Sequence, residues 1–552
     1  MISSLRRTLQ ANRSWLGIII STLLVWLWPR VSPPAVALVL IDFLILQSLP
    51  TRSNSEREAT LWNIPAAILT GLVLWIHFEL LTRGTGEFFQ PELLGSSYDS
   101  LAASFLGGSS ELDPATIRWE AMKNDGRVYM YFGPWPAILR IPLNLSMESY
   151  WGLWSRLSCF VASTLALCAF MRLAMRSLLG NPRLDWVKGR LLFLASILAF
   201  GLGTPLLFLT ITGSIYHESI LWGLAASIWA LDFAWMILVA EDPSDTALWG
   251  LSCAAGIALL SRVTFGAPLF GILAICSLFK WMGSGKRIDG VRGSFAPRTA
   301  VAIVPALAAV FLQAVYNMDR FDSPLAFARF DLLGYLVSNH ESWTSFETWG
   351  SLNLRRIPIG IFNFFGFQQD FVSSWFPWIR ATRAWYPEAN LYPQMFDSLV
   401  ISLTLASPCV VFGSALGVTW LFRSGGEWLL KLCVLGLFSE CVFVFSYFIM
   451  EQRYAADFLP FLVLGFALFL RGPSKQAPSR IPLRWLVNGT LILAIVSATT
   501  TMMSSLSVIP RHGVAQPRVY KQAWIQRFVY VNSALSSLKA SKGVDAKDLR
   551  TP

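Results

Sequence analysis

A candidate carboxylate lies in the polar segment after the third apolar run, in Tyr98-Asp99-Ser100-Leu101-Ala102. A carboxylate at the boundary between water and membrane can act as a general base that takes the proton from an acceptor hydroxyl. Six further acids share the segment: Glu87, Glu92, Glu111, Asp113, Glu120 and Asp125. Most such acids only keep a loop solvated, so residue type alone leaves both roles open for Asp99.

A second candidate is Tyr216-His217-Glu218, which opens a later apolar run. A histidine beside a glutamate at the mouth of a helix can orient a substrate, bind a metal or carry a proton. Glu218 also suits a helix N-terminus through the helix dipole alone. No HExxH pattern occurs, so a zinc site is not supported. The sequence predicts no cofactor, and a divalent metal stays open without support from the residues.

Two arginines complete the set of candidates. Arg262 interrupts an apolar stretch, and Arg453 precedes Tyr454 in a short polar turn. Arginine at such a depth can hold a phosphate through two parallel hydrogen bonds. The alternatives are an ordinary interfacial arginine that reaches the lipid head groups, or a structural pair between Arg453 and Glu451.

The composition indicates a membrane protein. The chain has 552 residues, of which 54% are hydrophobic and 14% are charged, whereas soluble domains carry roughly 25% charged residues. The net charge of +11 comes from basic residues in short loops between apolar runs, which is typical of cytoplasmic loops rather than of a nucleic-acid surface. All seven cysteines lie inside apolar runs, so they are expected to be packing residues.

The apolar runs predict an all-α polytopic membrane protein with about thirteen transmembrane helices. These runs form one transmembrane domain over residues 1–508, followed by a polar, basic tail over 509–552. Two long polar loops interrupt the domain at about 83–133 and 317–396, and residues 134–145 are expected to form an interfacial piece. The expected spans cover 15–28, 35–49, 61–81, 150–171, 191–212, 219–240, 248–260, 265–281, 299–316, 398–422, 428–450, 455–470 and 485–508.

The charges of the short loops predict the orientation. If the arginines before residue 15 are cytoplasmic, alternation of spans puts three further basic loops on the cytoplasmic side as well. The same alternation puts both long loops outside, with the N-terminus inside and the C-terminus outside the cytoplasmic membrane. It therefore gathers the polar residues of the outer loops and turns on one face: Asp99, His217, Glu218, Arg262, Glu451, Arg453 and Tyr454.

Charged residues also fall within expected spans, among them Asp42, Arg156, Asp232 and Glu440. Charges at this depth are costly, so they are expected to be paired or functional.

Three stretches resemble the GT-C class of polytopic glycosyltransferases, in particular bacterial proteins similar to dolichyl-phosphate-mannose mannosyltransferases. They are the first polar loop with Tyr98-Asp99 and the later run Gly126-Arg127-Val128-Tyr129-Met130-Tyr131-Phe132-Gly133-Pro134, the Tyr216-His217-Glu218 motif, and Arg453-Tyr454-Ala455-Ala456-Asp457-Phe458-Leu459-Pro460. The resemblance implies a transferase with a GT-C-like fold that takes a sugar from a polyprenyl-phosphate donor on the outer face.

It also implies site roles. Asp99 would be the catalytic base, and Tyr98, His217, Glu218, Arg262, Arg453 and Tyr454 would bind substrate. The implied partners are the lipid-linked donor and membrane lipids, with an acceptor that the sequence does not identify and no nucleic acid. Other interpretations stay open: a transporter or flippase of lipid-linked envelope precursors, a polymerase or ligase of surface polysaccharide, or a structural membrane protein.

Overall fold

The structure is a computed structural model, which describes residues 56–239, 244–284, 297–367, 371–387, 391–392, 399–473, 481–508 and 526–536. The expected spans 15–28 and 35–49, with Asp42, lie outside the described residues, as does most of the expected tail.

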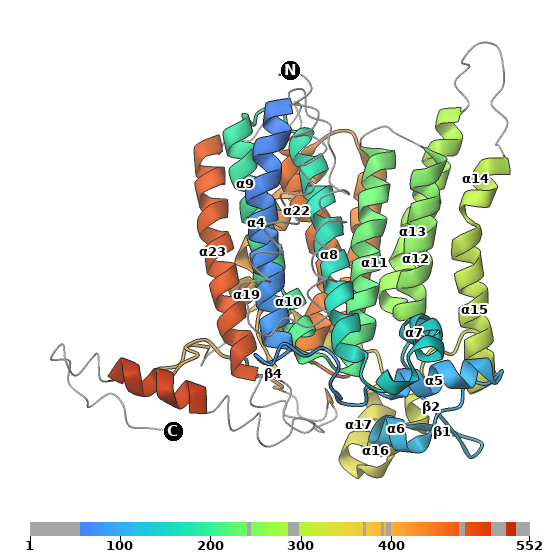
Figure 1. Ribbon diagram of the computed structural model, residues 1–552. Coiled ribbons are helices and arrows are strands. Elements are labelled where there is room, and N and C mark those ends of the chain that lie inside the picture. Colours follow the sequence, from blue (N-terminus) through green and yellow to red (C-terminus); the bar gives the residue numbers. More distant parts are fainter. Residues whose placement is uncertain are drawn as a thin grey trace.

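The described chain is an upright bundle of apolar helices with a layer of short elements at one end (Figure 1). Because no water is available in a bilayer to satisfy backbone groups, apolar runs of this length form helices that bond internally. The bundle helices are α4 (Glu56–Leu81), α8 (Ser155–Leu179), α9 (Trp186–Leu202), α10 (Pro205–Thr212), α11 (Ile215–Leu238), α12 (Asp245–Ser261), α13 (Val263–Ser284), α14 (Pro297–Ala302), α15 (Val304–Phe321), α20 (Pro408–Arg423), α21 (Trp428–Ser446), α22 (Leu459–Arg471) and α23 (Leu483–Val508).

Six stretches of the described chain are long and apolar enough to cross a membrane, or seven if a bent pair counts as one span. The polytopic all-α class is therefore confirmed, whereas the count of about thirteen is not. The bent pair is α9 and α10, which meet at 42° where one continuous span was expected. The bend has a local cause, because Pro205 has no backbone N–H to donate and Thr204 caps α10 at the Leu206 amide.

Helix α11 lies at the centre of the bundle, where it packs against α8, α12 and α13. Its Asp232 is fully buried and accepts hydrogen bonds from Arg172 and Arg176 of α8. Arg156, at the start of α8, pairs with Glu92 at 2.6 Å. Two of the charges expected within spans are thus paired. Neither oxygen of the fourth, Glu440, has a hydrogen-bond partner among the described residues.

The first polar loop folds into short elements: α5 (Ser97–Leu106), α6 (Pro114–Ile117), the 3₁₀ helix η1 (Arg118–Glu120), the antiparallel strands β1 (Met122–Asn124) and β2 (Arg127–Tyr129), α7 (Trp135–Ser146) and η2 (Glu148–Tyr150). Asp125 and Gly126 connect the two strands with φ of 48° and 79°, and two central residues with positive φ are typical of tight hairpin turns. Helix α7 occupies the piece expected to be interfacial.

The second polar loop contributes η3 (Phe330–Leu332), α16 (Gly334–Ser338), α17 (His340–Trp349), η4 (Leu354–Arg356), α18 (Ile357–Phe365), the paired strands β3 (Thr382–Arg383) and β4 (Leu399–Val400), and α19 (Leu403–Ala406), and η6 (Gln452–Phe458) follows α21. Elements of both loops lie at the same end of the bundle (Figure 1). Met122 bridges to Leu333, and the Asn124 side chain donates to the Arg320 carbonyl at 2.9 Å. The two loops therefore form one layer over the helix ends.

Gly133 joins this layer to the bundle. A Cβ at this position would lie 2.2 Å from the Leu260 carbonyl oxygen and 2.4 Å from that of Ser261. Both atoms are backbone at the C-terminal end of α12, so neither can move as a side chain would. A residue with a Cβ would therefore push the loop away from the helix.

We expect Gly133→Ala to destabilise the protein by about 1–3 kcal/mol, the usual range for overpacking, and to displace the neighbouring Phe132. Unfolding of the purified variant in detergent checks this. Gly126→Ala is the control for a surface glycine, because a Cβ there meets nothing within 4 Å and only its positive φ of 79° opposes the change. Equal stability of Gly133→Ala and wild type would contradict the close contact.

Candidate active site

A cavity of about 320 Å³ lies where the loop layer meets the bundle. Its wall combines the segment after β2, the first turns of α11, the junction of α12 and α13, α15, the second loop, the end of α21, and η6. Most of the wall is apolar or aromatic, and its charged members are Arg262, Arg320 and Arg453. The cavity thus combines a mostly apolar and aromatic wall with three arginine side chains.

The three arginines differ in how far their charge is compensated. The Nε atom of Arg262 bonds to Thr264 at 3.0 Å and lies 3.2 Å from Asp457. Arg320 is buried and donates to two backbone carbonyls and to Asn317. Arg453 makes no ion pair or hydrogen bond with any residue that the structure describes. Among the described residues, Asp457 is the one carboxylate in ion-pair contact with these three guanidinium groups, while Glu120 and Glu451 act on Arg453 from a longer distance. Guanidinium nitrogens that no carboxylate occupies suit an anionic ligand.

Aromatic rings hold two of these cations next to each other. The Arg453 guanidinium lies 4.5 Å from the centre of the Tyr216 ring and 5.3 Å from that of Tyr454. Arg262 lies 5.0 Å from the same Tyr454 ring. Cation–π contacts orient a guanidinium without using its hydrogen-bond donors. Tyr454 thus keeps both arginines in place while their terminal nitrogens stay available to a ligand.

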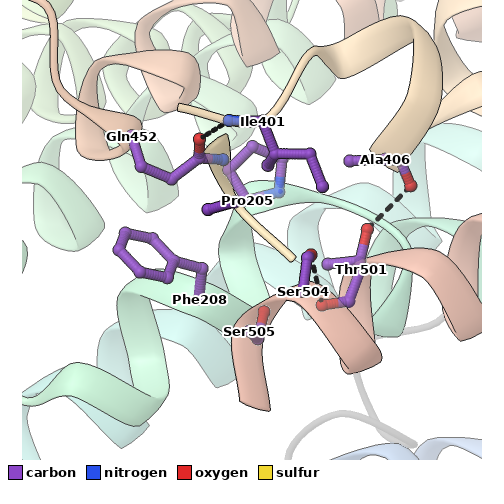
Figure 2. A pocket seen from close by; sticks show the side chains of 9 residues that line it. Pro205, Phe208, Ile401, Ala406, Gln452, Thr501, Ser504 and Ser505 are labelled. Carbon is purple, nitrogen blue, oxygen red and sulfur yellow. Dashed lines mark hydrogen bonds between the residues drawn. The ribbon is translucent and has the colours of Figure 1, made fainter. Parts of the chain in front are cut away.

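Helix η6, which carries Arg453 and Tyr454, is fixed from behind. The Gln452 side chain accepts a hydrogen bond from the Ile401 amide at 2.6 Å. Figure 2 shows this contact beside Pro205 and Phe208, at a very small cavity of about 10 Å³. A space of that size has room for one water molecule. The backbone next to Arg453 is therefore anchored to the bundle.

Glu120 is connected to the cavity wall through two phenols. The Tyr216 hydroxyl donates to its Oε1 at 2.5 Å, and the Tyr131 hydroxyl donates to its Oε2 at 3.1 Å. Both phenols line the cavity, whereas Glu120 itself is 5% exposed. Burial raises the pKa of Glu120 above its usual value, and the hydrogen bond from Tyr216 and the charge of Arg453 oppose that rise.

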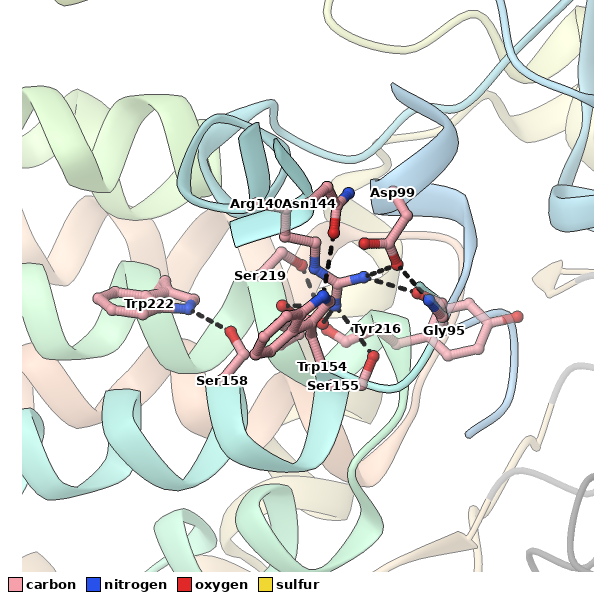
Figure 3. A network of polar contacts seen from close by, with 12 residues as sticks. Gly95, Asp99, Arg140, Asn144, Trp154, Ser155, Ser158, Tyr216, Ser219 and Trp222 are labelled. Carbon is pink, nitrogen blue, oxygen red and sulfur yellow. Dashed lines mark hydrogen bonds and ion pairs between the residues drawn. The ribbon is translucent and has the colours of Figure 1, made fainter. Parts of the chain in front are cut away.

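Asp99 occupies a different place from the one expected. It is fully buried, and its Oδ2 accepts hydrogen bonds from Arg140 at 2.6 Å and from the Gly152 amide at 3.1 Å. The same guanidinium donates to both oxygens of Glu218, at 2.9 and 2.7 Å. Arg140 thus joins α5 and α11 through two buried carboxylates (Figure 3).

Asp99 and Glu218 were expected to face the substrate. Neither residue belongs to the cavity wall, and both are held by the same buried cation. Oδ1 of Asp99 has no hydrogen-bond partner among the described residues. A base must reach the proton that it removes, and the role of Asp99 as base stays a prediction.

The other expected site residues divide between the cavity and its support. Arg262, Arg453 and Tyr454 line the cavity, as expected of substrate-binding residues. Tyr98 is fully buried with its ring 5.3 Å from the Arg140 guanidinium. His217 is also buried, with Nδ1 2.7 Å from the Ser214 hydroxyl and its ring against Phe208. These two residues therefore support the wall from behind.

The sequence did not single out four residues of the site: Glu120, Tyr131, Arg140 and Arg320. Glu120 was one of many acids in a loop, and Tyr131 lay within a motif without a role. Nothing in the sequence pairs Arg140 with acids 41 and 78 residues away. Among the described residues, no group of three or more His, Cys, Asp or Glu could hold a metal ion.

Comparison with known proteins gives a structural likeness only. No family model matches the chain, and no curated protein matches its sequence. The structure is similar to ArnT from Cupriavidus metallidurans bound to undecaprenyl phosphate, with 12% identity and a TM-score of 0.38 over 80% of this chain and 75% of ArnT. It is also similar to the oligosaccharyltransferase of Archaeoglobus fulgidus in the apo form, with 12% identity and a TM-score of 0.38 over 83% of this chain.

The chain spans 59% of the length of that oligosaccharyltransferase. A further structure of the archaeal enzyme, in complex with an inhibitory peptide and a dolichol-phosphate, gives 11% identity and the same TM-score. Similarity of this size assigns neither a substrate nor a residue.

Proposed function

We propose that this chain is a membrane glycosyltransferase that moves a sugar from a polyprenyl-phosphate carrier to an acceptor on the outer face of the cytoplasmic membrane. The observation that carries the proposal is the cavity itself, in which Arg262, Arg320 and Arg453 stand in an aromatic wall at one end of an apolar bundle. A lipid phosphate has the matching chemistry, an anion attached to an apolar chain. The motif resemblance points to the same class.

In this proposal the carrier phosphate binds between Arg453 and the free nitrogens of Arg262. As the bond from the sugar to the phosphate breaks, negative charge grows on the phosphate oxygens. Fixed cations in a site shielded from water stabilise that charge where it develops, which is often a large contribution to catalysis. Arg320, a buried member of the same wall, adds to the positive potential.

The aromatic wall has a second use. Tyr216, Phe132 and Phe330 line the cavity close to the arginines. Flat rings of this kind can pack against a sugar ring, while Phe443 and Val444 of α21 offer an apolar surface to the lipid chain. Asp99 and Glu218, held by Arg140, would keep α5 and the first turn of α11 in position beside this wall.

The orientation is part of the proposal. The loop layer and the cavity share one end of the bundle, and the positive-inside distribution of the sequence puts that end outside. The N-terminus would then be cytoplasmic and the C-terminus outside.

The test uses the purified full-length chain in lipid nanodiscs. We expect undecaprenyl phosphate to stabilise the protein against heat and undecaprenol, which lacks the phosphate, to have a much weaker effect. A panel of undecaprenyl-phosphate-linked sugars is then offered with envelope extracts as acceptors, and release of undecaprenyl phosphate from one donor is expected. Equal stabilisation by both lipids would contradict the proposal.

The transporter alternative predicts another outcome. In proteoliposomes a flippase moves the intact lipid-linked sugar between leaflets and leaves the bond from sugar to phosphate unbroken. Translocation of the intact donor without release of sugar would replace the transferase by a flippase.

A further inference from the structure

Glu120 is a buried carboxylate without a countercharge in contact. No ion pair of Glu120 is found in the described part of the chain, and its two oxygens accept hydrogen bonds only from Tyr216 and Tyr131. Burying a carboxylate without pairing it to a cation is costly. A glutamine could accept only one of the two phenol protons on its oxygen. Folding stability therefore does not explain why a carboxylate occupies position 120.

The two phenols connect Glu120 to the cavity. Each phenol has one proton, and each directs it to a different Glu120 oxygen. This leaves each phenol oxygen as a hydrogen-bond acceptor. The Tyr216 side chain also hydrogen-bonds with that of Trp119. Both tyrosines belong to the cavity wall, so a ligand hydroxyl in the cavity can donate to a phenol oxygen. The Arg453 guanidinium lies 4.5 Å from the centre of the Tyr216 ring. A hydroxyl bound at Tyr216 therefore lies next to the proposed phosphate site.

We propose that Glu120 receives the proton of the acceptor hydroxyl through the Tyr216 phenol. The proposal rests on the glycosyltransferase function proposed above and assigns the role of final proton acceptor to Glu120 instead of Asp99, which lies outside the cavity wall. Tyr216 is the residue that touches the acceptor, and Glu120 is a positioning residue that acts through it.

The step is balanced without any further reactant. The acceptor oxygen forms a bond to the anomeric carbon of the donor, and the bond from that carbon to the phosphate oxygen breaks. Its electron pair leaves with the polyprenyl phosphate, beside Arg453. The acceptor proton moves to the Tyr216 oxygen, while the Tyr216 proton moves over the 2.5 Å to Glu120 Oε1. Glu120 returns the proton to water after the product leaves.

The charges around Glu120 set the direction of its pH dependence. The titratable groups that act on it are Tyr131, Tyr216, Tyr335, Glu451 and Arg453. Burial raises the pKa of Glu120 and also that of Glu451, and Arg453 opposes both rises. The reactive form of Glu120 is the ionised one. Transfer is therefore expected to fall as pH drops through a pKa that lies above the usual glutamate value.

The first test compares Glu120→Gln and Tyr216→Phe with wild type in the transfer assay. We expect both variants to lose about 10²–10⁴-fold in kcat, the usual contribution of general base catalysis, and Glu120→Gln to lose the acid limb of the pH profile. Both should still be stabilised by undecaprenyl phosphate, because the arginines remain. Tyr392→Phe is the matched control, since this tyrosine donates to the Arg356 carbonyl away from the cavity, and its activity should equal that of wild type.

A second measurement needs no sugar donor. Infrared difference spectra of the protein between acidic and neutral pH should show a carboxyl that titrates above the usual glutamate range, together with a change in a tyrosine band. Burial also raises the pKa of Glu451, so the signal of that carboxyl remains in every variant. Glu120→Gln should lose the part of the carboxyl signal that changes together with the tyrosine band, and Tyr216→Phe should change that band.

The outcomes separate the two proposals. If no donor supports transfer but the carboxyl and tyrosine bands respond together, the transferase function fails and the Glu120–Tyr216 couple remains. If transfer occurs and Glu120→Gln keeps the wild-type rate and pH profile, the proton route is wrong while the transferase function remains. A spectrum of Glu120→Gln that equals the wild-type spectrum would also overturn the couple.

Discussion

Replacing Arg453 with methionine should lower sugar transfer by about 10²–10³-fold, the usual effect of removing one fixed donor to developing negative charge. Methionine keeps a long apolar stem against Tyr216 and Tyr454, so the change removes mainly the charge and the donors. Arg453 forms no ion pair with a carboxylate among the described residues. Its charge opposes the rise in the pKa of Glu120 and of Glu451, so its loss also makes these two acids harder to ionise. Binding of undecaprenyl phosphate should weaken as well, measured as a smaller thermal stabilisation in nanodiscs.

Arg453→Lys refines this prediction. A lysine restores the charge but presents it as a point, without the planar fork that binds two phosphate oxygens. We expect activity between those of wild type and Arg453→Met. If lysine gave the same loss as methionine, recognition would depend on guanidinium geometry more than on charge.

Arg355→Met provides the control at the same end of the protein. Arg355 also lies over an aromatic ring, 5.2 Å from the centre of Trp349, but it is exposed and outside the cavity wall. Its replacement should leave both transfer and lipid binding unchanged. A large loss in Arg355→Met, or none in Arg453→Met, would place the phosphate site elsewhere.

The sequence predicted the parts of this site that depend on position along the chain. Arg262 and Arg453 each interrupt an otherwise apolar stretch, so hydropathy alone placed them at the ends of spans, and both line the cavity. The same reasoning could not tell which acid faces the cavity. Asp99 and Glu120 lie in one polar loop, and only the fold turns the first toward Arg140 and connects the second to Tyr216.

Hydropathy located some of the helices but missed the breaks within others. Apolar runs located α8, α11 and α21 closely, because burial in lipid requires such a run. In two places the hydropathy pattern predicted one continuous span where the chain is interrupted. The expected span 191–212 bends at Pro205, and the expected span 398–422 begins with strand β4 and the short helix α19 before α20. Hydropathy averages over these residues and therefore does not detect the breaks.

The pairing of Arg140 with two acids leads to the second large effect. Arg140→Met should destabilise the protein by about 3–5 kcal/mol, because removing one partner of a buried ion pair leaves charge without compensation. Here the loss leaves both Asp99 and Glu218, each fully buried, without a cation. Unfolding of the purified protein in mixed detergent micelles measures the change. Lys188→Met is the control, since Lys188 pairs with Asp185 at an exposed position and should have little effect.

The triple variant Asp99→Asn, Arg140→Met and Glu218→Gln should restore most of the stability that Arg140→Met loses. It removes all three charges and keeps similar side-chain volumes. Replacing a buried ion triad by neutral groups is often tolerated, so most of the stability should return. The triple variant also separates the two roles for Asp99. If Asp99 only positions α5 against α11, the folded triple variant retains sugar transfer, whereas Glu120→Gln does not. A triple variant that is as stable as wild type, binds undecaprenyl phosphate and transfers no sugar would return the role of base to Asp99 and remove it from Glu120.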